Sequence, residues 1–344
     1  MMVKSNHYRV LSCEGIDQVG KGDAILNLSQ KLLDLGIPVT YSSFPIYATP
    51  TGTVIRLFLN NGLENFNLDK IKELKVKMAL YAINRLEFMD VLLSNPLYKK
   101  TLIILDRSPF SNAVTIGYGL ATVKELKNKE AVGGLIDYAL KLESLMIKKM
   151  NLTNCVVQMV DQCVTWENVR GEKSDINEND SVQMFSSKVY DMYEDRVGKG
   201  WLKVVTKNEE GWRGRGVISN EIYEFLISRV GNLEKDSKKK MYSMRYEIGI
   251  EEILSNIYKG EVLPSGILIK YLNALRSNNK DLMHKYGCEI GIQVGKTCQL
   301  VKFKNRRVRV ALGTIINELP EVLDVLSEFI SKDFVSKFSK ALNE

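Results

Sequence analysis

The sequence has few of the residues that build metal centres and disulfide frameworks. Its 344 residues include two histidines and five cysteines, and no pair of cysteines has C-x-x-C spacing. An odd number of scattered cysteines argues against both a zinc site and a set of disulfides. We expect Cys13 and Cys155, which lie in apolar runs, to be small buried thiols. Unpaired thiols are typical of a reducing compartment, so the sequence favours a cytoplasmic location.

Long hydrophobic runs are also missing. No stretch approaches the roughly 18 apolar residues that a membrane-spanning helix requires, and the polar segment Met1–Arg9 shows no targeting signal. We therefore expect no membrane partner. Hydrophobic residues make up 45% of the chain and charged residues 26%, which is typical of a globular protein. The net charge of +7 is uneven, because the part from Lys235 onward has 19 Lys and Arg against 13 Asp and Glu.

The most distinctive segment is Val10–Asp23, an apolar run that leads into a glycine-containing turn and a lysine. Glycines let backbone N–H groups converge on an anion, and the lysine stands where the next helical pattern begins. The spacing matches G-x-x-x-x-G-K-[ST] except at the last position, which is glycine. The sequence predicts a polyphosphate-binding loop, with a glycine-rich β–α turn that binds no ligand as the alternative. The loop residues are Gly15, Gln18, Val19, Gly20, Lys21, Gly22 and Asp23.

Short apolar runs alternate with helical patterns over the first 230 residues. This order predicts an α/β fold, a P-loop kinase core in which helices flank a parallel sheet. The expected strands are Tyr8–Cys13, Val39–Ser43, Thr101–Asp106, Asn154–Val160 and Leu202–Val205. The expected helices are Ala24–Leu35, Thr53–Leu59, Asp69–Leu93, Glu130–Lys149, Asp180–Val197 and Asn220–Val230.

A charged segment at residues 235–240 separates this pattern from the rest of the chain. We predict one domain over residues 1–234 and a smaller basic α+β domain over residues 241–344. The second domain would have short strands over 289–312 and helices over 246–259, 265–286, 319–330 and 333–342. Lys302–Arg309 has five cations in eight residues and is strand-like. A solvated edge strand is the favoured interpretation, and a nucleic-acid surface is the alternative. The apolar helical stripes of this region fit either a core or a homodimer surface.

Two further pairs of residues carry chemistry. Asp106 and Arg107 end an apolar strand, so their side chains emerge beside the predicted loop, where open α/β sheets bind ligands. An acid there can hold hydrated Mg²⁺ while an arginine contacts phosphate. Tyr81 and Arg85 lie one turn apart on a helix, an aromatic ring beside a cation. Taken alone, the first pair is more often a cap or ion pair, and the second a solvated charge beside a core tyrosine.

Four segments together resemble the thymidylate kinase family in order and spacing, over about residues 8–230. They are Glu14–Asp17, Phe44–Pro45 with Thr49–Gly52, Tyr81–Glu87 and Asp106–Ala113. The resemblance implies a nucleoside monophosphate kinase that transfers the γ-phosphate of ATP to dTMP, or a related deoxynucleoside monophosphate, with Mg²⁺ as cofactor.

The resemblance also implies roles for individual residues. Lys21 and the loop would hold the phosphates of ATP, and Arg107 would contact the transferring phosphate. Arg170, in a lid over Trp166–Lys173, would neutralise developing charge, and Asp17 would face the acceptor sugar and phosphate. The metal would be held by Asp106 and, through water, by Asp23, although a carboxylate at position 23 could instead repel phosphate. The acceptor-binding residues would be Asp17, Phe44, Pro45, Tyr81, Arg85, Arg107, Ser111 and Asn112.

Four positions depart from the family pattern. Tyr47 stands where the family has an arginine, Ser108 where it has a tyrosine, and Gly22 and Asp23 where the loop has hydroxyl residues. These departures leave an alternative function open. In that alternative the chain is a catalytically weak nucleotide-binding protein whose basic C-terminal region binds nucleic acid or a partner.

Overall fold

The computed structural model describes residues 8–47, 49–61, 63, 66–94, 98, 101–123, 126, 128–162, 180–231, 303, 305–329 and 335–336. The chain forms two compact units. The first, here the sheet unit, comprises Met1–Ser43, Pro96–Lys173 and Asn177–Tyr246. The second, the helical unit, comprises Phe44–Asn95, Ser174–Ile176 and Glu247–Glu344.

The sheet unit is built on six strands in the order β2-β3-β1-β4-β5-β6. The strands are β1 (Arg9–Glu14), β2 (Val39–Ser43), β3 (Leu102–Asp106), β4 (Val156–Asp161), β5 (Trp201–Asn208) and β6 (Gly211–Trp212). All neighbours pair in parallel except β6, which is antiparallel to β5. Because β1 lies between β3 and β4, the chain reverses its direction across the sheet there, and ligands bind at such points. The predicted α/β class and the five predicted strands are confirmed, while β6 was not predicted.

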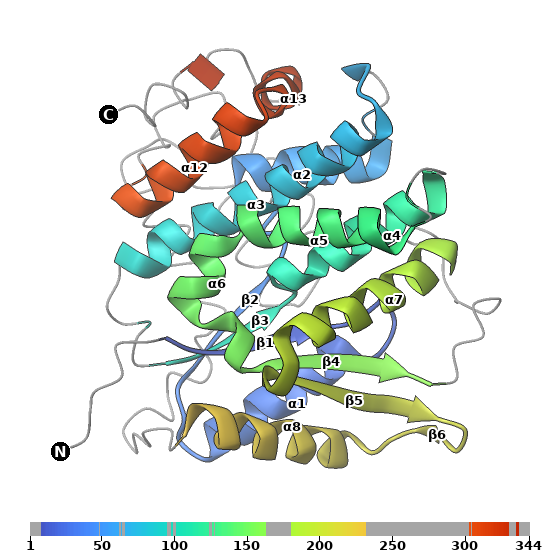
Figure 1. Ribbon diagram of the computed structural model, residues 1–344. Helices are drawn as coiled ribbons and strands as arrows, with labels where there is room; N and C mark the ends of the chain where they lie inside the picture. The colour runs from blue at the N-terminus through green and yellow to red at the C-terminus, as the bar shows by residue number, and fades with distance from the viewer. Residues whose placement is uncertain are drawn as a thin grey trace. The chain divides into compact units, whose positions relative to one another are not determined.

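Helices cover both faces of this sheet (Figure 1). They are α1 (Lys21–Asp34), α4 (Asn112–Thr122), α5 (Lys129–Leu142), α6 (Ser144–Met150), α7 (Asp180–Val197) and α8 (Arg215–Val230). Helices α1 and α8 pack together on one face, and α4 packs against α7 on the other. The helix predicted as Glu130–Lys149 is divided at Glu143, whose buried carboxylate lies 3.5 Å from Asn112 Nδ2.

Helix α4 is absent from the sequence prediction because glycine and β-branched residues give it a low helix propensity. Its close packing explains one of the glycines. A Cβ at Gly117 would lie 2.7 Å from the backbone nitrogen of Ser186 on α7, so only glycine lets the two helices approach this closely.

The helical unit contains α2 (Pro50–Asn61), α3 (Lys70–Ser94), α12 (Arg306–Glu318) and α13 (Glu321–Phe329). Helix α3 packs against α2, α12 and α13. In the described part of the chain, no helix combines the length and the apolar character needed to cross a membrane.

The strand predicted at Lys302–Arg309 is wrong, because α12 begins at Arg306. The Asn305 side chain caps this helix by accepting a hydrogen bond from the Arg307 N–H at 3.0 Å. The alternating cations coincided with a helical pattern whose buried positions are Val308, Leu312, Ile315 and Ile316. The helix expected over 319–330 is confirmed by α13. The elements expected between 241 and 302 lie outside the described residues, and the division into domains at 234 and 241 stays a prediction.

Candidate active site

The turn after β1 has the backbone of an anion-binding loop. Gly15 has a φ of 137° and Gly20 a φ of 77°, and Gln18 between them is also left-handed at 62°. A Cβ at Gly15 would lie 2.6 Å from the Met159 carbonyl oxygen on β4, so glycine is required there. Successive residues of this kind form concavities lined by N–H groups. Thr206 on β5 holds the loop by donating a hydrogen bond to the Val19 carbonyl at 2.7 Å.

Lys21 is the first residue of α1, and its side chain bonds back to the loop that precedes it. Its Nζ donates hydrogen bonds to the carbonyl oxygens of Gly15 at 3.0 Å and Ile16 at 2.6 Å, and it lies 4.0 Å from Asp17 Oδ1. Burial of the ammonium group, with a smaller contribution from nearby Arg107, lowers the pKa of Lys21 from 10.5 to about 8. The ammonium is therefore held by neutral carbonyls and is poorly compensated, which favours an anionic ligand.

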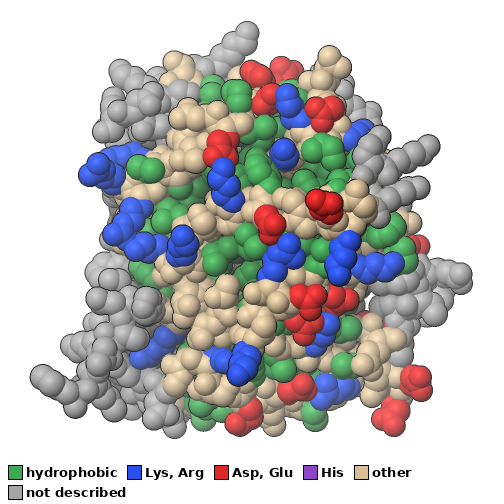
Figure 2. All heavy atoms as spheres, in the orientation of Figure 1, with side chains coloured by type: hydrophobic (Ala, Val, Ile, Leu, Met, Phe, Trp, Pro, Cys, Tyr) green, Lys and Arg blue, Asp and Glu red, His purple; other side chains and the backbone are tan. Residues whose placement is uncertain are grey.

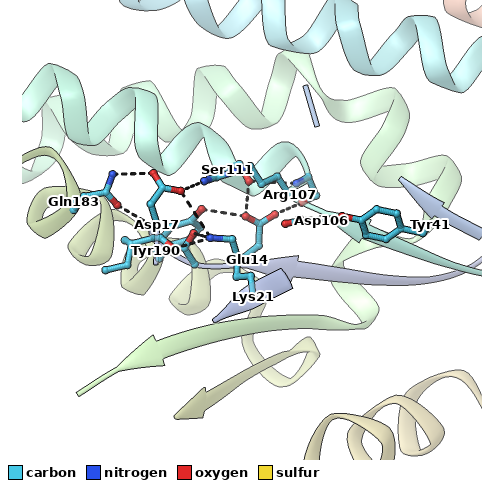
Figure 3. A network of polar contacts seen from close by, with 12 residues as sticks. Glu14, Asp17, Lys21, Tyr41, Asp106, Arg107, Ser111, Gln183 and Tyr190 are labelled. Atoms are coloured by element: carbon cyan, nitrogen blue, oxygen red, sulfur yellow. Dashed lines mark hydrogen bonds and ion pairs between the residues drawn. The ribbon is translucent and has the colours of Figure 1, made fainter. Parts of the chain in front are cut away.

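Asp17 and Arg107 form an ion pair above this loop (Figure 3). Gln183 on α7 completes the arrangement, because its Nε2 donates to Asp17 Oδ2 at 3.1 Å and its Oε1 accepts from the Asp17 N–H at 2.9 Å. Burial raises the pKa of Asp17, but the charges of Arg107 and Lys21 outweigh this effect and hold it below its ordinary value. Asp17 is therefore ionised at neutral pH.

A buried carboxylate, Glu14, organises the turn that carries Arg107. It accepts hydrogen bonds from Ser108 Oγ at 2.6 Å, Ser111 Oγ at 2.5 Å and the Tyr190 hydroxyl at 3.1 Å. Burial raises the pKa of Glu14, and these hydroxyl groups partly oppose the shift. Arg107 itself has a left-handed backbone with a φ of 69°. The network fixes the short helical turn Pro109–Ser111 that follows, so it holds Arg107 in this unusual conformation.

Asp106 ends β3 and is paired in register with Cys13 of β1, next to the loop. Its Oδ2 accepts a hydrogen bond from the Tyr41 hydroxyl at 3.1 Å (Figure 3). Among the described residues, its buried Oδ1 has no hydrogen-bond partner. A buried carboxylate oxygen without a donor fits a cation or a water bound to one. Asp23, in contrast, is 61% exposed and pairs with Arg215 of α8 at 3.2 Å.

Over the ranges that the structure describes, no cluster of three or more His, Cys, Asp or Glu side chains is arranged to hold a metal. Mg²⁺ typically uses one or two carboxylates together with substrate phosphates and water. Asp106 fits that mode of binding.

The helical unit holds the predicted residues Phe44, Pro45, Tyr81 and Arg85. Arg85 is buried, and its guanidinium carbon lies 5.9 Å from the ring centres of both Phe44 and Tyr81. Asn84 fastens the preceding segment to α3, because its side chain bonds the N–H of Ile46 at 2.8 Å and Thr49 Oγ1 at 2.8 Å. These contacts hold Phe44 beside Arg85.

Glu87 lies one turn after Asn84 on α3. It accepts a hydrogen bond from Thr51 Oγ1 at 2.8 Å. Burial raises the pKa of Glu87 from 4.5 to about 7, against the opposing effect of Thr49, Thr51 and Asn84.

Two more predicted residues lie in the turn after β3. Ser111 is occupied by its hydrogen bond to Glu14. Asn112 begins α4 and donates from Nδ2 to the Pro109 carbonyl at 3.0 Å. Its buried Oδ1 has no partner in the described part of the chain. Arg170 and the lid Trp166–Lys173 lie outside the described residues.

Sequence reasoning did not identify Tyr41, Gln183 or Trp212 as members of this site. The Trp212 ring borders the loop, since a Cβ at Gly20 would lie 3.1 Å from it, and the side chain is 60% exposed. Lys207 Nζ lies 5.7 Å from the ring centre. The available signal was an aromatic residue directly after Gly211, the glycine of the turn that follows the last parallel strand.

The fold and this loop together define a P-loop α/β protein. Residues 13–137, which include the loop, Arg85, Asp106 and Asn112, match the family model described as thymidylate kinase. The predicted resemblance is confirmed over this segment, and the family model ends before the C-terminal region.

Comparison with solved structures gives a similar chain, the thymidylate kinase from Candida albicans, whose structure is described as revealing the origin of broad substrate specificity and a novel structural element. It is 19% identical, covering 66% of this chain and 94% of that chain, with a TM-score of 0.48. None of the curated proteins matches the sequence.

Proposed function

We propose that the protein is a magnesium-dependent kinase that transfers the γ-phosphate of ATP to dTMP or a related deoxynucleoside monophosphate. The observation that carries the proposal is the grouping of Lys21, Asp17, Arg107 and Asp106 at the carboxyl ends of β1 and β3 (Figure 3). Two cations and one unpartnered carboxylate oxygen at a glycine loop fit a metal-bound polyphosphate.

The donor phosphates would replace the carbonyl partners of Lys21. Phosphate oxygens are stronger acceptors for an ammonium than neutral carbonyls, so Lys21 would turn toward the ligand and regain a higher pKa. Asp106 would hold Mg²⁺ through its Oδ1, and the ion would neutralise charge on the phosphates. Exposed Trp212 offers a flat surface beside the loop on which the donor base can stack.

The acceptor phosphate would be contacted by Arg107, which Asp17 and the Glu14 network hold in place. Asp17, kept ionised by its two cations, can accept a hydrogen bond from the acceptor sugar. Asn112 Oδ1 is a buried acceptor without a donor and fits the N–H edge of a pyrimidine. In the helical unit, Arg85 and Tyr81 offer a cation and an aromatic ring, a pair that fits a nucleotide base. The transfer needs no covalent intermediate, because positioning and charge neutralisation provide the catalysis.

A weak nucleotide-binding protein is the second candidate. The pairing of Asp23 with surface Arg215 favours it, because neither Gly22 nor Asp23 then provides a hydroxyl or a carboxylate at the loop. Its nucleic-acid version has less support. On the face of the molecule that Figure 2 shows, the Lys and Arg side chains of the described residues are interspersed with Asp and Glu. A nucleic-acid surface, in contrast, gathers cations in a stripe.

Acceptor-dependent formation of ADP tests the proposal. The purified protein would be incubated with ATP, Mg²⁺ and a panel of deoxyribo- and ribonucleoside monophosphates. We expect ADP only when an acceptor is present, with dTMP among the best. Lys21→Ala should lower the rate by at least about 100-fold, whereas Lys31→Ala is the control, because Lys31 lies on the same helix and contacts Asn220 at the surface.

If no ADP formed with any acceptor, the proposed kinase function would be refuted. Salt-sensitive binding of DNA or RNA by the same inactive protein would then support the second candidate.

A further inference from the structure

Helix α3 is buried around its whole circumference. Val76–Leu80 and Ala82–Leu86 are each five consecutive buried residues, longer than one turn of 3.6 residues. Helix α2 accounts for one side, and α12 and α13 pack on α3 as well. A helix of this kind needs a partner on each side. The C-terminal helices are therefore part of the structural support of α3.

Polar contacts join these helices near both ends of α3. Asp90 Oδ1 accepts a hydrogen bond from the N–H of Asn305, the residue that caps α12, at 2.7 Å. Near the other end, Lys72 Nζ lies 2.8 Å from Glu321 Oε1 at the start of α13. The two contacts are separated by about 27 Å along α3, and Tyr81 and Arg85 lie between them.

The charges at the start of α12 explain why a carboxylate stands at position 90. The first turn of α12 carries Arg306, Arg307 and Arg309 at the positive end of the helix dipole. Cations are unfavourable at that end, and an anion that bonds the capping residue offsets them. Asp90 is 8% exposed, so its carboxylate is held in a fixed position between α3 and α12.

We propose that Asp90 is a positioning residue that fixes α3 through α12 and so holds Tyr81 and Arg85 in place for the acceptor nucleotide. Asp90 contacts no substrate in this scheme. Because Arg85 precedes it by about one and a half turns of the same helix, a shift of α3 at Asp90 moves Arg85 as well. This gives the C-terminal helices a function in acceptor binding. The inference rests on the proposed kinase function, from which its test is separable.

The test compares Asp90→Leu, which removes the contact, with Asp90→Asn, which keeps an acceptor oxygen and removes the charge. Asp195→Leu, on the exposed side of α7, is the matched control. We expect Asp90→Leu to raise the KM for the acceptor roughly tenfold and to leave the KM for ATP within about twofold of the wild-type value. Asp90→Asn should have an intermediate effect, and the control should have none.

Hydrogen exchange at the amides of α3 provides a measurement that does not depend on activity. Asp90→Leu should speed exchange over α3 and leave α1 unchanged. The charge reversal Lys72→Glu should act in the same direction, and adding Glu321→Lys should reverse it.

The outcomes separate the two proposals. An inactive wild-type protein would refute the proposed kinase function. Hydrogen exchange at the amides of α3 would still test whether α12 supports α3. An active wild type whose acceptor KM and α3 exchange are unaffected by Asp90→Leu would overturn the positioning role. A proportional loss of kcat and both affinities would also overturn it, because that pattern reports only a smaller folded fraction.

Discussion

Replacing Glu87 with glutamine should stabilise the protein at pH 8 and change how its stability depends on pH. The pKa of Glu87 is raised from 4.5 to about 7 by burial. A raised pKa means that the folded protein holds this proton more tightly than the unfolded chain does. The resulting stability is present below about pH 4.5 and is lost as the pH rises toward 7, after which the folded state carries a costly charge.

The magnitude follows from the size of the shift. Each pKa unit corresponds to about 1.4 kcal/mol, so a shift from 4.5 to about 7 corresponds to about 3 kcal/mol. Because the side chain retains some solvent access, we expect about 2 kcal/mol. Glutamine resembles the protonated acid and keeps an oxygen for the Thr51 hydroxyl. Asn84 Nδ2 loses little, since it already donates to Ile46 O and Thr49 Oγ1.

Denaturant unfolding followed by circular dichroism between pH 4.5 and 8 measures this effect. The difference between wild type and Glu87→Gln isolates the one group, because other buried carboxylates contribute equally to both proteins. The variant should become relatively more stable by about 2 kcal/mol as the pH rises from 4.5 to 7. If the free energies of unfolding of wild type and Glu87→Gln changed in parallel with pH, the reasoning would be refuted. Glu130→Gln, at an exposed position on α5, is the control and should change in parallel with wild type.

Two further predictions concern the loop and the helix packing. Trp212→Ala should raise the KM for ATP about tenfold, by the loss of one stacked base, and leave the affinity for inorganic tripolyphosphate, measured by calorimetry, unchanged. An equal loss for both ligands would show that the ring supports the loop and does not bind a base. Gly117→Ala should destabilise the protein by about 1–3 kcal/mol, because its Cβ would lie 2.7 Å from the Ser186 nitrogen. In thermal unfolding, Gly134→Ala on α5 is its control, since a Cβ there meets nothing within 4 Å.

The features that could be predicted from the sequence are local. Strand β1, the turn and helix α1 follow one another within 26 residues, and each has its own signature in glycine, lysine or an apolar run. Asp106 and Arg107 could be placed beside the loop because parallel strands bring their carboxyl ends to one edge. These inferences need only periodicity and sheet topology.

The partners of the site residues could not be predicted in the same way. Glu14 is bonded by Ser108, Ser111 and Tyr190, which lie 94 to 176 positions away in the chain. Only tertiary packing brings them together. The prediction of a strand at α12 failed for another reason. The alternating cations have the two-residue period of a strand, whereas the capping residue Asn305 and the 3.6-residue period of the buried positions are those of a helix. The cap was the stronger local signal.

The charges around the glycine loop are unequally compensated within the protein. Lys21 and Arg107 repel each other, and burial lowers the pKa of the lysine to about 8. Asp17 compensates by pairing with the arginine, while Glu14 remains behind the turn and is satisfied by hydroxyl groups. Arg107 is thus neutralised within the protein and Lys21 is left with carbonyls. A ligand that carries several negative charges supplies what Lys21 lacks, whereas a neutral ligand would have to compete for hydrogen bonds that the loop already makes.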